Sequence, residues 1–124
     1  MFTQEIPRAQ WTPFFDDFSL RHEGWIVSVE IIGFDIGDQE QSRRPLAGVS
    51  AEVKDRLARI EISVGNPLDG HFVHIIEAPE RVLCKSPAIP GDEAIEIEDD
   101  AGRKTLVTFV RIGIGQTDRQ LPES

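Results

Sequence analysis

Two histidines and a carboxylate lie close together in one apolar stretch of the chain. His71, His74 and Glu77 follow each other at intervals of three residues. Imidazole nitrogens and carboxylate oxygens are ordinary zinc ligands, so these side chains could hold a metal ion. On a regular strand, residues three apart point to opposite faces, and convergence would need a bulge near Gly70. The alternative is that each histidine has a separate role, with His74 half-buried and hydrogen-bonded among apolar neighbours.

Glu30 is a carboxylate inside the apolar stretch WIVSVEIIG at residues 25–33. If it is buried, its pKa rises and it could act as a general acid or base. The alternative is a cross-strand ion pair with Arg59 or Arg111. No nucleophile or oxyanion motif accompanies Glu30, so an enzyme that uses Glu30 and a histidine is the least favoured of three hypotheses.

A ligand pocket between a helix and a sheet is the second candidate site. Trp11 and Trp25 flank an aromatic-rich segment, and their large rings are typical of small-molecule pockets. With Glu30 and His74 they form the predicted ligand-binding set, and Trp11, Trp25 and His74 mark the expected crevice.

Two other groups of residues have simpler explanations. The acidic run at 92–100 could bind calcium, but it lacks the D-x-D-x-D-G spacing, and a solvated strand face and turn is the alternative. Cys84 beside Lys85 could be a reactive thiolate, or a small buried hydrophobe. The chain contains no G-x-S-x-G, P-loop or G-x-G-x-x-G motif, and we predict no cofactor.

An N-terminal helix would position the aromatic residues. Thr12 and Pro13 fit the N-cap and first helical position, although a start near Pro7 with a kink at Pro13 fits as well. Gly24 is placed to end the helix in a left-handed conformation. One helical face is aromatic, because four residues recur at the spacing i, i+3, i+4, i+7. These residues are Trp11, Phe14, Phe15 and Phe18.

About six short strands follow the helix. They are predicted at 25–33, 45–53, 57–64 and 71–77 and in a hairpin at 93–112, with 81–85 as a further edge segment. Short turns link them, and no helix lies between them, so an antiparallel meander is expected. In the second strand, alternation predicts Ala47, Val49, Ala51 and Val53 facing inward, and Gly48 indicates a bulge or bend. The expected fold is α+β and mostly β: a helix packed on a strongly bent sheet or half-open small barrel.

Length and charge restrict the class of protein. The 124 residues fit one domain, with its core at about 7–112 and loose tails at 1–6 and 113–124. The net charge of −9 disfavours binding to nucleic acids and to anionic membranes. A single cysteine, no signal-like N-terminus and no apolar run of roughly 20 residues favour a cytoplasmic location.

The sequence also resembles a known family. The segments IPRAQW, FFDDFSLRHEGW, VSVEIIG, PLAGVS, IEISVG and EAIEIEDDAGRKTLVTF are similar to those of short bacterial proteins known only as a domain of unknown function. The resemblance covers about residues 6–109. Its motifs are turn glycines, strand patterns and helix aromatics, so it implies one compact bacterial domain and transfers no catalytic residue.

These observations favour a non-catalytic module that acts through its surface, by self-association or by docking to another protein. Short strands with free edges favour pairing between strands of different chains, and a homo-oligomer is one expected outcome. The alternative is a regulatory domain that binds a small molecule or metal between the helix and the sheet.

Overall fold

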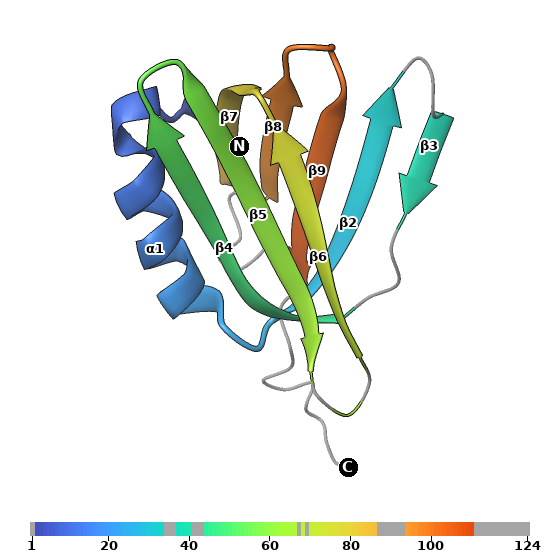
Figure 1. Cartoon of the computed structure of the whole chain (residues 1–124). Helices are drawn as coiled ribbons and strands as arrows, with labels where there is room; N and C mark the ends of the chain where they lie inside the picture. Colours follow the sequence, from blue (N-terminus) through green and yellow to red (C-terminus); the bar gives the residue numbers. More distant parts are fainter. Residues whose placement is uncertain are drawn as a thin grey trace.

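The computed structural model describes residues 2–33, 37–40, 44–66, 68, 70–86 and 94–110. One helix and a bent antiparallel sheet make up this part of the chain (Figure 1). The elements in chain order are β1 (Phe2–Glu5), the 3-10 turn η1 (Arg8–Gln10), α1 (Trp11–His22), β2 (Ile26–Gly33), β3 (Gly37–Glu40), β4 (Arg44–Lys54), β5 (Leu57–Asn66), β6 (Gly70–Glu77), β7 (Pro79–Ser86), β8 (Ala94–Asp99) and β9 (Lys104–Val110).

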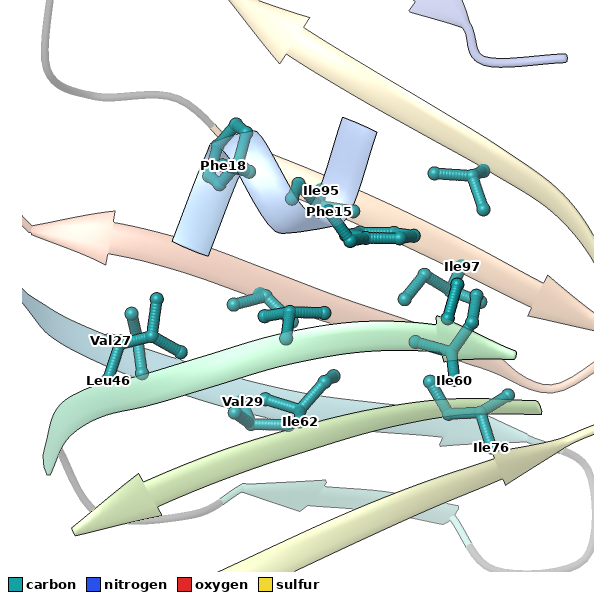
Figure 2. Close-up of a cluster of buried hydrophobic side chains, with 14 of the residues drawn as sticks. Phe15, Phe18, Val27, Val29, Leu46, Ile60, Ile62, Ile76, Ile95 and Ile97 are labelled. Carbon is teal, nitrogen blue, oxygen red and sulfur yellow. The ribbon is translucent and has the colours of Figure 1, made fainter. Parts of the chain in front are cut away.

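The sheet consists of two arms that meet between β2 and β4. Its strand order is β1-β7-β8-β9-β2-β4-β5-β6, with β3 paired to β2 beside this path. β2 and β4 pair only at Ile26 with Pro45 and at Val27 with Arg44, and the sheet bends there. One buried cluster takes side chains from both arms, as Figure 2 shows for Ile60 and Ile97. The predicted strongly bent antiparallel sheet is therefore confirmed, and it does not close into a barrel.

The helix α1 packs along the part of β4 that does not pair with β2. The Ser19 hydroxyl donates to the Val49 carbonyl at 2.7 Å and accepts from the Val49 N–H at 2.8 Å. The Thr12 hydroxyl donates to the Ala51 carbonyl at 3.1 Å. Buried backbone groups need partners, and these two hydroxyls supply them along β4. The helix thus takes the place of a neighbouring strand.

The aromatic face of the helix is confirmed, and of its two predicted starts the one near Pro7 fits better, because the 3-10 turn η1 follows Pro7 and leads directly into α1. Trp11, Phe15 and Phe18 are buried, and Phe14 packs against the same cluster. Thr12 is the second residue of α1 rather than its N-cap, because its hydroxyl bonds to β4. The helix ends as expected: the C-cap is Glu23, and Gly24 follows with φ of +86°.

Two strands lie outside the predicted set of about six. Residues 2–5, expected in a loose tail, form β1 and pair with β7, and Ile6 is buried with its N–H on the Val82 carbonyl at 2.8 Å. The expected edge segment 81–85 is therefore an inner part of β7. Residues 37–40, expected in a polar connection, form β3 against β2. Both extra strands are four residues long, too short to show a clear alternation of apolar residues.

A bulge in β4 changes which residues face the core. The register with β5 shifts between Leu46 and Gly48, at the glycine that indicated a bulge. Leu46 is consequently buried and Ala47 exposed, whereas the alternation predicted Ala47 inside. Past the bulge, Val49 and Ala51 face the core as predicted.

The predicted hairpin is confirmed as β8 and β9. Ile95 and Ile97 alternate into the core, and Gly102 has φ of +84° in the turn. The buried Asp99 carboxylate holds the turn together: it accepts from the N–H groups of Ala101 and Arg103 at 3.0 and 2.9 Å. Its other oxygen accepts from the Arg103 Nε at 3.1 Å.

Candidate functional site

The predicted metal ligands lie on β6 and point to both of its faces. His74 pairs with the buried Ile62 of β5 and so faces the core side, whereas His71 and Glu77 pair with Gly65 and Arg59 on the outer side. No bulge interrupts the pairing of β5 with β6, so the histidines do not converge. Within the described ranges, no three histidine, cysteine, aspartate or glutamate side chains are arranged to hold a metal ion.

His74 lines a cavity of about 150 Å³ between β6 and the opposite arm. Ile31 of β2, Thr105 of β9 and the Asp99–Arg103 pair of the hairpin turn lie around it. Burial lowers the pKa of the His74 imidazole below its usual 6.5, and the positive charge of Arg103 lowers it further. His74 is therefore a half-buried histidine that favours its neutral form.

The four predicted ligand-binding residues lie in different parts of the fold. Trp11 begins α1 and donates from Nε1 to the Ile6 carbonyl at 2.8 Å, while Trp25 follows the helix and meets the His22 ring edge-on at 4.7 Å. The 12-residue helix separates them. Glu30 points away from the core, because its neighbour Val29 is buried there and side chains alternate along a strand.

Aromatic side chains fill the inner helix–sheet contact. Phe18 stacks on His22 at 4.0 Å and contacts Phe109 at 4.9 Å. A helix–sheet cavity of about 570 Å³ instead opens on the outer side of α1 and β4. Asp16, Ser19 and Leu20 of the helix and His71 of β6 are among the residues that line it.

The described residues of the acidic run and Cys84, the other candidates from the sequence, lie in or beside the sheet. Asp99 of the acidic run is engaged in the β8–β9 turn, and residues 92 and 93 lie outside the described part of the chain, as do Arg111 and the tail 113–124. Cys84 packs against the core, and the Lys85 ammonium lies 3.0 Å from the Glu96 carboxylate.

Among the described residues β6 pairs with β5 alone, and its free edge is a feature that the sequence predictions did not include. β6 ends one arm of the sheet (Figure 1), and the side chains of Phe72, Val73 and Ile75 are 45%, 54% and 46% exposed. Phe72 also lies under the Arg44 guanidinium, 4.4 Å from its ring centre. The signal for this edge was present in the sequence, since apolar residues occupy both faces of the strand.

In the described part of the chain, the other strands that end the sheet or its side branch are shorter. β1 and β3 each have four residues, whereas β6 has eight. β3 carries Asp38 and Glu40 in its sequence GDQE, and β1 ends at Glu5. Short length and charge protect edges from pairing with other chains. The long and nearly uncharged β6 lacks this protection.

Comparisons with known proteins extend over most of the chain. A model of a family of unknown function, DUF5335, matches residues 2–114. An uncharacterized protein of Aquifex aeolicus (strain VF5) is 37% identical over 111 residues, which cover 89% of this chain and 83% of the relative. No solved structure matches. Among the described residues, no helix has the length and apolar character needed to cross a membrane. Because the family model spans nearly the whole sequence, the chain belongs to this family of unknown function, DUF5335.

Proposed function

We propose that the protein is a non-catalytic interaction module that binds a partner along the free edge of β6. The observation that carries the proposal is the exposure of Val73 and Ile75, at 54% and 46%, on an eight-residue strand that ends the sheet. A partner strand laid against such an edge gains main-chain hydrogen bonds, and apolar side chains beside them add specificity.

The positions of the titratable residues support binding rather than catalysis. Glu30 and His74 point to opposite sides of the sheet, and His71 and His74 point to opposite faces of β6. A general acid or base must reach the reacting atom together with its partner group. These pairs do not provide such a constellation.

Replacing the exposed apolar pair of β6 by lysines tests this function. Tagged wild-type protein and the double variant Val73→Lys/Ile75→Lys are expressed in the source organism, and the co-purifying proteins, including untagged copies of the chain, are quantified. We expect the variant to lose them, because lysine disfavours edge pairing.

A matched control adds the same charge elsewhere. Leu20 and Leu57 are 80% and 76% exposed and lie outside β6, so Leu20→Lys/Leu57→Lys should keep the co-purifying proteins. Circular dichroism and thermal unfolding verify that both variants fold. Equal recovery with the β6 variant and the wild type would contradict the proposed function.

A further inference from the structure

The hydrogen-bonding groups on the free edge of β6 belong to every second residue. The Ala78 N–H donates to the Ala58 carbonyl, and the pairing of β5 with β6 continues this register from Arg59 and Glu77 onward. Hydrogen-bonded and non-hydrogen-bonded pairs alternate along antiparallel strands. The backbone groups of His71, Val73, Ile75 and Glu77 therefore point away from β5, toward any added strand.

The side chains of these same residues complement one another when the strand is reversed. Reversing β6 about His74 places Val73 opposite Ile75, and His71 opposite Glu77. Two apolar pairs then lie at the centre of the outer face, with an imidazole and a carboxylate opposite each other at either end. Apolar pairs stabilise cross-strand contacts, and an imidazole N–H can donate a hydrogen bond to a carboxylate opposite it.

We infer that the partner of β6 is β6 of a second copy of this chain, paired antiparallel with His74 opposite His74. This inference rests on the proposed function. The β4-β5-β6 arm of each copy then joins that of the other, and the two arms form one continuous sheet across a twofold axis. On the inner face, Phe72 lies opposite Ile76 of the second copy, so apolar side chains flank the axis on this face too.

The local charge permits this contact in an acidic protein. The chain has a net charge of −9, which opposes contact between most parts of two copies. β6 has the sequence GHFVHIIE, with Glu77 as its single carboxylate, and Glu77 already lies 3.6 Å from the Arg59 guanidinium. A contact restricted to strand pairing is at the small end of specific interfaces, so we expect a weak, concentration-dependent dimer.

Charge complementation between variants tests the pairing. The purified wild-type protein should change from monomer to dimer with rising concentration in sedimentation equilibrium. Val73→Lys/Ile75→Lys places lysine opposite lysine and should weaken the dimer at least about tenfold, as should Val73→Glu/Ile75→Glu. Mixing the two variants places lysine opposite glutamate, and association should return as a heterodimer. Leu20→Lys/Leu57→Lys should dimerise like the wild type.

A cysteine at the twofold axis tests the register. In a Cys84→Ala background, His74→Cys places two thiols in a non-hydrogen-bonded pair, where Cα atoms lie about 4.5 Å apart, within disulfide range. Val73→Cys places them diagonally, roughly 7–8 Å apart and beyond that range. Mild oxidation should therefore give a disulfide-linked dimer with His74→Cys and not with Val73→Cys.

The outcomes separate this inference from the proposed function. A wild-type chain that stays monomeric at all concentrations overturns the self-pairing, and the proposed function survives if the lysine variant still loses other co-purifying proteins. A dimer that the lysine variant leaves intact, or that is cross-linked through Val73→Cys instead of His74→Cys, also overturns the inference. Loss of the wild-type dimer in both charged variants, with recovery on mixing, supports it.

Discussion

At the scale of single residues, His74 makes stability depend on pH. Its folded pKa lies below the ordinary 6.5 because burial and Arg103 disfavour the imidazolium. The unfolded chain then binds a proton more readily than the folded one, so the contribution of His74 to stability is complete above about pH 6.5 and declines as the pH falls toward the folded pKa. We expect a lower free energy of unfolding at pH 5.5 than at pH 8, measured by urea denaturation.

Substituting the two histidines of β6 in turn isolates this effect. His74→Gln removes the titrating group and should reduce the difference between the two pH values. His71→Gln, on the exposed outer face of β6, is the matched control for replacing an imidazole by an amide. An unaltered pH dependence in His74→Gln would assign the effect to other titratable groups instead.

Residue spacing alone could predict which way the β6 side chains point. Residues three apart on a strand lie on opposite faces, and the structure places His71 and His74 in that way. The neighbours of His74 across the cavity, Ile31 and Arg103, come from distant segments. Strand alternation carries no information about such distant contacts, so the cavity could not be predicted.

At the scale of elements, the bonds from α1 to β4 should matter for stability. Ser19→Ala leaves the Val49 N–H and carbonyl without the hydroxyl that bonds to both. Because this contact is partly buried, we expect the free energy of unfolding to fall by about 1–2 kcal/mol in urea denaturation.

An exposed serine on the same strand provides the control. Ser50 follows Val49 on β4 and is exposed. Ser50→Ala should change stability by no more than about 0.5 kcal/mol. Equal losses from the two substitutions would show that the Ser19 hydroxyl has no special part in holding the helix to the sheet.

Long elements could be predicted because they repeat their pattern several times. The aromatic face of α1 and the alternation of Ile60 and Ile62 in β5 are examples. β1 and β3 were missed because main-chain pairing, rather than a repeated apolar pattern, defines a four-residue strand. The role of the Thr12 hydroxyl could not be predicted either, because its partner, the Ala51 carbonyl, is distant in sequence.

At the scale of the whole molecule, local and long-range pairing form the two arms of the sheet. β4, β5 and β6 are consecutive hairpins, whereas β2 pairs with β9 from the other end of the described chain. The sequence predicted the hairpins, since short turns join them. It did not predict that β9 lies beside β2, because only the closed core brings these strands together.

This difference should appear in the folding kinetics. Val64 in β5 pairs with Leu46 and Phe72 of the adjoining hairpins, whereas Val29 in β2 pairs with Val107 of β9. Both valines are buried, at 4% and 2% exposure, so each change to alanine should lower the free energy of unfolding by about 1–3 kcal/mol.

Local contacts form early because they require little loop closure. In stopped-flow measurements Val64→Ala should therefore mainly slow folding, and Val29→Ala should mainly accelerate unfolding. Slower folding in Val29→Ala with an unchanged unfolding rate would instead place the β2–β9 pairing in the transition state.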